Sequence, residues 1–289
     1  MRVAELKARL LSVVRRGPRQ VLWVPDNVNL GNFLYHWLRA HRDQTSGLDV
    51  RARTSAAMRP WLEAIPQASR LVVAPEEVRF GDLRVMGMHQ DWGVDYDGET
   101  LHRFVREILL PSGALHEHPA TELGVDDLVI NVRRGDYYSH PVHFQTYGFD
   151  QSDYIRQAVE LSLQVGGPIP RIHLVTDGLT WCRETLGWLR DYTDSLTFCE
   201  PGESARENFA TIASARRIAL TNSTFGYWAA YVANVLHADQ GADNRNQVVA
   251  PWFHARIGDG KAEQLDPGWH TIRDPRWELP PNPTWGVPE

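Results

Sequence analysis

The sequence predicts an α/β fold in two domains, and three observations carry that prediction. In the C-terminal half, short apolar segments alternate with longer helical segments, which indicates a parallel sheet. A shorter alternation of the same kind opens the chain. The length of 289 residues and the hydrophobic content of 43% suit two domains with ordinary cores. We expect an N-terminal α/β domain over residues 1–120 and a C-terminal one over 121–289, with the boundary near Pro111–Gly124.

The N-terminal half contains fewer clear elements. Apolar residues recur at helical spacing over its first segment, and Gly17-Pro18 ends that pattern. Residues 81–98 are rich in loop-forming residues. The expected elements are, in order, a helix over Met1–Arg16, a strand over Gln20–Val24, a helix over Asn32–His41 and a strand over Arg70–Ala74.

The C-terminal half alternates regularly between strand and helix. The expected elements are the strand Leu128–Val132, a helix capped by Ser152 and running to Val165, the strand Arg171–Thr176, a helix over Trp181–Leu189, the strand Leu196–Cys199, a helix over Ala205–Arg216, the strand Arg217–Thr221, a helix over Thr224–His237 and the strand Gln247–Ala250. After Asp266 the chain is rich in proline and tryptophan, and we expect this tail to wrap over a domain.

Composition excludes several classes of protein. A net charge of −6 argues against a nucleic-acid partner or a membrane-surface protein, because both need a basic face. No apolar run approaches the roughly 18 residues of a membrane-spanning helix. Cys182 and Cys199 are too few for a disulfide framework and indicate reduced thiols. We therefore expect a cytoplasmic protein with no integral membrane segment, and nothing in the sequence indicates an oligomeric state.

Two adjacent arginines, Arg133 and Arg134, follow the predicted strand Leu128–Val132 and precede Gly135. Ligands of open α/β sheets bind at the carboxyl ends of the strands. The planar guanidinium group of arginine suits a diphosphate. The alternative is an ordinary surface pair of arginines beside a turn, since so short a motif occurs by chance.

Other predicted strands deliver polar residues to the same edge. Asp177 and Gly178 follow one strand, and Asn222–Phe225 follow another and begin a helix. That start is either a simple helix N-cap or a phosphate cradle, and one segment can serve as both. In the first half, Asn29–Asn32 also passes from a strand to a helix, but it fits neither a P-loop nor a dinucleotide-binding fingerprint.

These segments resemble the motifs of the α-1,2-fucosyltransferases, glycosyltransferase family 11. Arg133-Arg134-Gly135-Asp136-Tyr137 resembles the HxRRGDY motif. Five further segments resemble family blocks in the same order: Asn29–Asn32 the GLGNQ loop, Asp153–Ala158 the DYYxxAI helix, Val175–Cys182 the FSDDxxWC block, Asn222–Ala230 the NSSFSWWGA block, and Pro251–Phe253 the terminal PxxWF.

The resemblance implies a GT-B-like fold, in which two Rossmann-like domains face each other across a cleft. It implies an inverting transferase that moves fucose from GDP-β-L-fucose to a hydroxyl of a glycan or glycoconjugate, forming an α-1,2 linkage. No metal and no cofactor are implied, and the partners are the GDP-sugar donor and the acceptor. The N-terminal domain would carry the acceptor side.

The resemblance also implies roles for individual residues. Arg133 would hold the β-phosphate and neutralise the departing GDP. Arg134 and Asp136 would shape the loop, and Asp177 would meet the guanine. The other donor-site residues are Gly31 and Asn32, which would close over the donor from the N-terminal domain, together with Asn131, Asn222, Ser223, Thr224 and Phe225.

The chain departs from the family pattern at several positions. Asn131 stands where the motif has histidine, Gly178 replaces the second aspartate of the SDD block, and Phe33 replaces the glutamine of GNQ. Gly226 replaces the serine that follows the phenylalanine of NSSFSWW, and Tyr227 replaces its first tryptophan. Two alternatives therefore stay open: a transferase of the same fold that uses another nucleotide sugar such as GDP-mannose, and a sugar-nucleotide or glycan-binding protein without turnover.

A catalytic base is the least determined part of the site. His143 is the first candidate, because it follows the arginine motif and imidazole is the side-chain type best suited to proton transfer near neutral pH. His140 and His36 are alternatives, and each histidine can equally be a packing or surface residue. Asp95-Tyr96-Asp97 resembles a DxD metal motif, but we interpret it as a solvated turn. His116-Glu117-His118 lacks a third metal ligand.

Overall fold

The computed structural model describes residue 17 and residues 19–241, 247–256 and 262–277. The helix expected over Met1–Arg16 lies outside the described residues. The chain divides into two compact units, Met1–Ala114 and Leu115–Glu289. This division falls inside the Pro111–Gly124 segment in which the sequence places the boundary. Each unit contains a parallel sheet with helices, so the predicted α/β class is confirmed.

The first unit contains a four-stranded parallel sheet in the order β3-β2-β1-β4. Only β1 and β3 were expected from the sequence. The strand β2 has just Val50 and Ala52 facing the core, between charged residues, and β4 lies in the segment assigned to loop. The strands are β1 (Arg19–Leu22), β2 (Asp49–Arg53), β3 (Val72–Val73) and β4 (Leu83–Val85).

The main helix of this unit is α2 (Leu30–Thr45), which begins earlier and ends later than predicted. Its apolar residues Phe33, Leu34 and Trp37 are fully buried. Two helices were not predicted, α3 (Arg59–Ala64) and α4 (Gly98–Phe104). The side chain of Asp97 caps α4 by accepting from the Thr100 amide at 2.8 Å. Asp95 lies in a turn and Asp97 is exposed, as expected, whereas Tyr96 between them is buried.

The second unit contains a six-stranded parallel sheet in the order β10-β9-β8-β5-β6-β7. Every strand predicted for this half is present. The strand β10 was not predicted, because it lies in the proline- and tryptophan-rich tail. The strands are β5 (Leu128–Val132), β6 (Ile169–Thr176), β7 (Thr193–Phe198), β8 (Arg217–Leu220), β9 (Val248–Pro251) and β10 (His270–Ile272).

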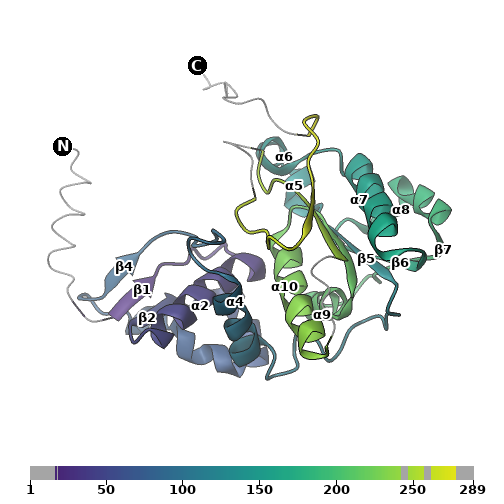
Figure 1. The fold of residues 1–289 in the computed structure, drawn as a ribbon. Helices are drawn as coiled ribbons and strands as arrows, with labels where there is room; N and C mark the ends of the chain where they lie inside the picture. The colour runs from purple at the N-terminus through teal and green to yellow at the C-terminus, as the bar shows by residue number, and fades with distance from the viewer. Residues whose placement is uncertain (1–16, 18, 242–246, 257–261, 278–289) are drawn as a thin grey trace, which may run out of the picture. The chain divides into compact units, whose positions relative to one another are not determined.

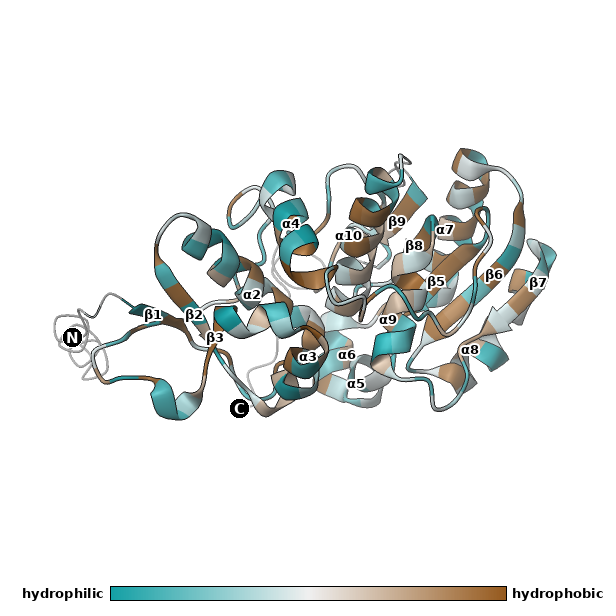
Figure 2. Cartoon of the chain, turned by 90° about the horizontal axis from the view of Figure 1, so that it is seen from below, coloured by the Kyte–Doolittle hydropathy of each residue, from teal (hydrophilic) through white to brown (hydrophobic). Residues whose placement is uncertain are grey.

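Helices cover both faces of this sheet (Figure 1). The helices α7 (Gln151–Gly166) and α8 (Leu179–Thr185) share one core with β5 and β6, whereas α9 (Ala205–Ser214) and α10 (Thr224–Asp239) pack together on the opposite face. The helix α10 is hydrophobic over most of its length, as expected for a helix buried on nearly all sides (Figure 2).

Three helical predictions for the second unit need correction. The cap of α7 is Asp150, whose side chain accepts from the Asp153 amide, and not Ser152. The helix expected over Trp181–Leu189 is α8 followed by a 3₁₀ turn over Gly187–Asp191. Two short helices, α5 (Gly135–Ser139) and α6 (Pro141–Tyr147), lie where a loop was expected.

The strand order reverses at β5. From β5 the chain proceeds through β6 to β7 on one side of the sheet, then crosses to β8, β9 and β10 on the other side. The carboxyl ends of β5 and β8 are therefore neighbours, and the Thr221 amide donates to the Asn131 carbonyl at 3.0 Å. Such a switch point is where open α/β sheets bind their ligands.

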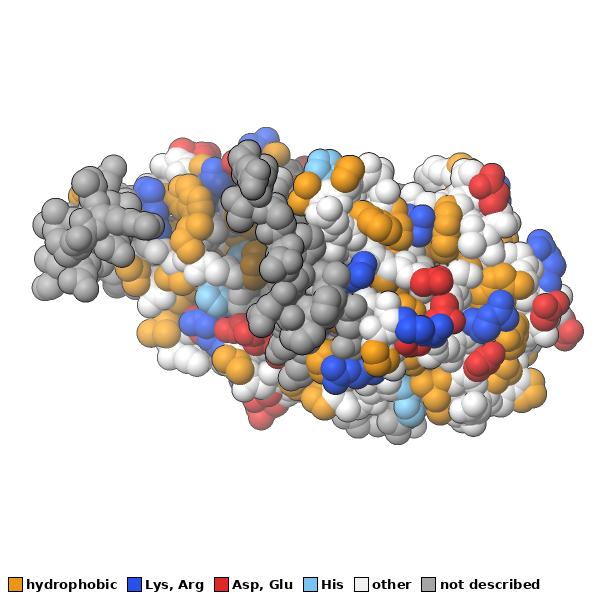
Figure 3. Space-filling view, turned by 90° about the horizontal axis from the view of Figure 1, so that it is seen from above, with side chains coloured by type: hydrophobic (Ala, Val, Ile, Leu, Met, Phe, Trp, Pro, Cys, Tyr) orange, Lys and Arg blue, Asp and Glu red, His pale blue; other side chains and the backbone are white. Residues whose placement is uncertain are grey.

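The tail packs onto the second unit, as expected, up to residue 277. The strand β10 pairs with β9, and Trp277 is buried against Phe149 and Tyr154. On the face drawn in Figure 3, acidic and basic side chains are interspersed among the coloured residues. None of the helices in the described residues is long and apolar enough to cross a membrane.

Candidate functional site

The loop after β5 is fixed by hydrogen bonds to its backbone. The Arg133 amide donates to Thr221 Oγ1 at 2.9 Å, and Gln151 Nε2 donates to the Arg133 carbonyl at 2.9 Å. The turn continues through Gly135 at φ +27°, where a Cβ would lie 2.6 Å from Asp177 Oδ2. Glycine is therefore required here, both by the backbone conformation and by the close approach of Asp177.

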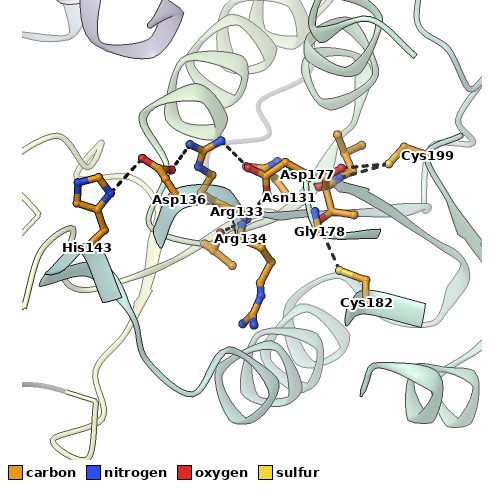
Figure 4. A network of polar contacts seen from close by, with 12 residues as sticks. Asn131, Arg133, Arg134, Asp136, His143, Asp177, Gly178, Cys182 and Cys199 are labelled. Carbon is orange, nitrogen blue, oxygen red and sulfur yellow. Dashed lines mark hydrogen bonds and ion pairs between the residues drawn. The ribbon is translucent and has the colours of Figure 1, made fainter. Parts of the chain in front are cut away.

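The Arg133 side chain lies between two carboxylates (Figure 4). Its Nη1 is 2.5 Å from Asp177 Oδ2, and its Nη2 is 2.5 Å from Asp136 Oδ1. The side chain remains 33% exposed, so the guanidinium group can reach a ligand at this edge. Two carboxylates hold it in a fixed orientation, and an incoming phosphate can replace either of them as its partner.

Asp177 connects the ends of β5 and β6. Besides pairing with Arg133, it accepts a hydrogen bond from the Arg134 amide on Oδ1 at 2.6 Å. Both carboxylate oxygens therefore bind the arginine loop. Asp177 therefore connects the arginine loop after β5 to the end of the neighbouring strand β6.

Arg134 points away from the Arg133 guanidinium (Figure 4). Its guanidinium carbon lies 3.5 Å from the ring centre of Tyr138 and 3.9 Å from that of Trp181, which is a cation–π sandwich. Burial lowers the pKa of Arg134 from its ordinary value. A Cβ at Gly178 would come within 2.6 Å of the Arg134 Cβ, so this stack requires the glycine that replaces the motif's second aspartate.

His143, from α6, faces the same group of charges. Its Nδ1 lies 3.4 Å from Asp136 Oδ2, and the His140 ring lies beside it at a centroid distance of 4.8 Å. The side chain of His143 is 44% exposed. Arg133, Asp136 and His143 thus form one continuous chain of polar contacts (Figure 4).

The start of α10 carries polar groups that the described residues leave unused. Ser223 is the N-cap, but its hydroxyl makes no capping hydrogen bond. Asn222 donates to the carbonyls of Tyr147 and His254 at 2.9 and 2.8 Å, while its Oδ1 is buried without a partner among the described residues. The expected N-cap is present, and its hydroxyl and first-turn amides are available to a ligand.

Three further residues of this edge were expected at the site. Asn131 is 5% exposed, and its Nδ2 donates to the Val175 carbonyl at 3.2 Å. Its Oδ1 is buried and has no partner among the described residues. Thr224 and Phe225 are half-buried in the first turn of α10, where the Phe225 ring meets Phe209 edge-on at 5.4 Å.

The expected residues of the first unit lie at the start of α2. Gly31 is buried, and Asn32 Oδ1 accepts from Gln90 Nε2 at 3.1 Å. His36 is 1% exposed, and both of its ring nitrogens lack a partner among the described residues. Burial lowers the pKa of His36 to about 4, with a smaller contribution from His89. No group of three His, Cys, Asp or Glu side chains within the described ranges could hold a metal ion.

Sequence reasoning missed four residues that hold the arginine loop in place. They are Gln151, Thr221, Tyr138 and Trp181. Thr221 and Trp181 were visible as the end of a strand and a motif residue. For Gln151 and Tyr138 the sequence carries no signal, because their roles depend on the path of α5 and the start of α7.

The site lies within a segment that matches a known family. Residues 99–238 match the model of glycosyl transferase family 11. This part of the chain is thus similar to glycosyl transferase family 11. The resemblance expected from the arginine motif is therefore confirmed. This family 11 segment includes Arg133, Asp177 and the start of α10, whereas Gly31 and Asn32 lie outside it.

Curated relatives match the same region. Galactoside alpha-(1,2)-fucosyltransferase 1 of Homo sapiens is 30% identical over 142 residues, which cover 46% of this chain and 36% of the human protein. The protein of the same name from Bos taurus is 31% identical over 118 residues, covering 40% of this chain and 30% of its own length. The chain thus spans about a third of the length of these relatives.

Among solved structures, the chain resembles a crystal structure of POFUT1 in complex with GDP, with a TM-score of 0.31 and 14% identity. This similarity covers 80% of this chain and 76% of the other chain. A structure of POFUT1 in complex with GDP-fucose aligns with a TM-score of 0.29 and 11% identity, covering 81% and 75%.

Proposed function

We propose that this protein is an inverting, metal-independent fucosyltransferase. It transfers fucose from GDP-β-L-fucose to a hydroxyl of a glycan or glycoconjugate, forming an α-1,2 linkage. The observation that carries this proposal is the position of Arg133. This partly exposed guanidinium group follows β5. The start of α10, where the Ser223 hydroxyl makes no capping hydrogen bond, follows β8. Both lie at the point where the strand order reverses.

The chemistry of this edge suits a diphosphate leaving group. Attack of the acceptor oxygen on C1 of the sugar forms one bond. The bond from C1 to the β-phosphate oxygen breaks, and its electron pair leaves with GDP. Arg133 stabilises the growing negative charge by exchanging a carboxylate partner for the phosphate. The first-turn amides of α10, with the hydroxyls of Ser223 and Thr224, complete the binding site for the diphosphate.

His143 is the base of this proposal. Asp136 faces its Nδ1 at 3.4 Å, which leaves Nε2 to take the proton of the acceptor hydroxyl. The same carboxylate binds Arg133. Phosphate binding to Arg133 would release Asp136 to hold His143 more tightly, so donor binding and base orientation are connected through one side chain.

The remaining site residues take supporting roles. Both oxygens of Asp177 bind the arginine loop, which favours a positioning role over the guanine contact that the resemblance implies. Arg134 stabilises the loop through its aromatic stack. The free thiols of Cys182 and Cys199 favour the cytoplasm as the place of reaction.

A second candidate uses a different nucleotide sugar. The buried Oδ1 of Asn131, at the position of the motif's histidine, has no donor among the described residues. An unpaired buried acceptor calls for a partner, and a ligand hydroxyl or N–H group can supply one. A donor other than GDP-fucose, such as GDP-mannose, can match this acceptor. A sugar-nucleotide-binding protein without turnover is the remaining alternative.

Calorimetric titration of the purified full chain tests the proposal. GDP, UDP and ADP are compared in EDTA and in magnesium, followed by GDP-fucose, GDP-mannose and a glycan acceptor screen. The proposal predicts selective, magnesium-independent binding of GDP and GDP-fucose, and GDP release when an acceptor is present. Preference for UDP, or GDP-fucose binding without any hydrolysis or transfer, would contradict it.

A further inference from the structure

Two positions at which this chain departs from the family motifs touch each other. A Cβ at Gly226 would lie 2.4 Å from Asn131 Oδ1 and 3.1 Å from Leu220 Cδ2. Real Cβ atoms do not approach a carboxamide oxygen this closely. The Asn131 carboxamide therefore occupies the space that any other residue at 226 would need.

The glycine has no conformational explanation. Gly226 lies in the first turn of α10 and is not among the glycines with positive φ in the described residues. A glycine inside a helix costs roughly 0.5–1 kcal/mol relative to alanine. Packing against Asn131 accounts for its presence.

The Asn131 side chain has little freedom to move aside. It is 5% exposed, and its Nδ2 is bound to the Val175 carbonyl. This hydrogen bond assigns Oδ1 to the side that faces α10, where it is buried and lacks a donor among the described residues. A larger residue at 226 would displace either the carboxamide or the first turn of the helix.

The contact between Asn131 and Gly226 adjoins the backbone hydrogen bonds that hold Arg133 in place. The Asn131 carbonyl accepts from the Thr221 amide at 3.0 Å, and Thr221 Oγ1 accepts from the Arg133 amide at 2.9 Å. The Thr221 carbonyl in turn accepts from the Ser223 amide at 2.8 Å. The Arg133 loop and the start of α10 thus share one hydrogen-bonded frame at the ends of β5 and β8.

We propose that Asn131 and Gly226 are a coupled pair of positioning residues that sets the spacing between the first turn of α10 and the Arg133 loop. The spacing determines how well the two phosphates of the donor fit between them. This inference rests on the proposed function. It adds Gly226 to the residues that position the donor.

A double-mutant cycle tests the pair, with G226A, N131A and the double variant N131A/G226A. The readouts are the Kd for GDP, the Kd for guanosine and the Tm of each variant. G187A is the matched control, because a Cβ there meets only Arg190 Nη1, at an ordinary 3.6 Å. Guanosine lacks phosphates, so it reports changes of the site that do not concern the diphosphate.

We expect G226A to weaken GDP binding at least about tenfold, with guanosine binding and G187A unchanged. Removal of the carboxamide makes room for the methyl group, so the double variant should bind GDP within about threefold of N131A, and its Tm should exceed that of G226A. If G226A fails to fold, folding of the double variant shows the same coupling.

Two results would overturn the inference. One is GDP binding by G226A at the wild-type affinity. The other is additive effects of the two substitutions on both Kd and Tm. If the wild-type chain binds no GDP, the proposed function and the positioning role both fail. Non-additive effects of N131A and G226A on Tm would then still show that the two positions pack against each other. This result distinguishes a failure of the proposed function from the absence of the contact.

Discussion

Arg133 and Asp177 are 44 positions apart in the sequence and are joined by an ion pair of 2.5 Å at the carboxyl edge of the second sheet. The other oxygen of Asp177 holds the Arg134 amide. One carboxylate therefore fixes both the side chain of the first arginine and the backbone of the second. A guanidinium group held in this way is oriented before the ligand arrives, which is the condition for effective electrostatic stabilisation.

Asp177→Asn should weaken this orientation without changing the volume of the side chain. We expect GDP affinity to fall about tenfold, because Arg133 loses its charged partner and the Arg134 amide loses a charge-assisted hydrogen bond. Calorimetric titration with GDP measures the effect. Asp136→Asn is the control, since it removes the other carboxylate that binds Arg133 and leaves the hydrogen bond from the Arg134 amide to Asp177 intact. Equal losses for the two variants would show that Asp177 acts only as a charge.

Arg134→Lys should lower stability more than it lowers donor affinity. Lysine keeps the charge but cannot stack as a plane between the rings of Tyr138 and Trp181. We expect a loss of about 1–2 kcal/mol in the free energy of unfolding, measured by urea denaturation. A cycle with Trp181→Ala isolates the stacking energy. A large loss of GDP affinity at unchanged stability would instead indicate direct contact with the diphosphate.

Acid should destabilise the second unit through two buried histidines. Burial lowers the pKa of His254 and of His173 to about 4, from an ordinary 6.5. Between these pH values the unfolded chain binds a proton that the folded chain does not, so the free energy of unfolding falls as pH decreases from 6.5 to 4.

Each of these histidines contributes at most one proton to that slope. Urea denaturation at a series of pH values measures it, and His173→Asn should flatten it. A free energy of unfolding that stays constant between pH 6.5 and pH 4 would show that these rings are not buried in the neutral form.

Trp277→Ala should destabilise the second unit by about 3–5 kcal/mol, because it removes a large side chain from the core. Trp277 is 3% exposed and packs against Phe149 and Tyr154, and its Nε1 donates to Asp153 Oδ2 at 3.2 Å. Denaturation followed by circular dichroism measures the loss, and Trp277→Phe should recover most of it. A cost below about 1 kcal/mol would show that the tail does not pack on the core in solution.

The sequence predicts the second unit better than the first, for a physical reason. The strands β5 and β8 are buried on both faces, so their apolar runs stand out. The strand β2 is half-buried, and its Asp49, Arg51 and Arg53 hide the pattern. Likewise β10 was missed because only Ile272 of its three residues is buried.

The sequence predicts those site residues that can be recognised from their immediate neighbours in the chain. Arg133 and Ser223 follow directly from their strand ends. The partners of these residues depend on long-range packing: Thr221 and Gln151 bind the Arg133 backbone from two different elements. Gly178 and Gly226 looked like departures from a motif. Their reason became visible only when the side chains of Arg134 and Asn131 were placed beside them.

The most direct test of the account is donor turnover by Arg133→Ala compared with Arg133→Lys and with the wild-type chain. Arg276→Lys, at an exposed ion pair remote in sequence, is the control. The account predicts that kcat/KM for GDP-fucose falls by about three orders of magnitude or more in Arg133→Ala, with an unchanged Tm and partial recovery in Arg133→Lys. Near-normal turnover by a folded Arg133→Ala protein would contradict the role of this guanidinium group at the diphosphate.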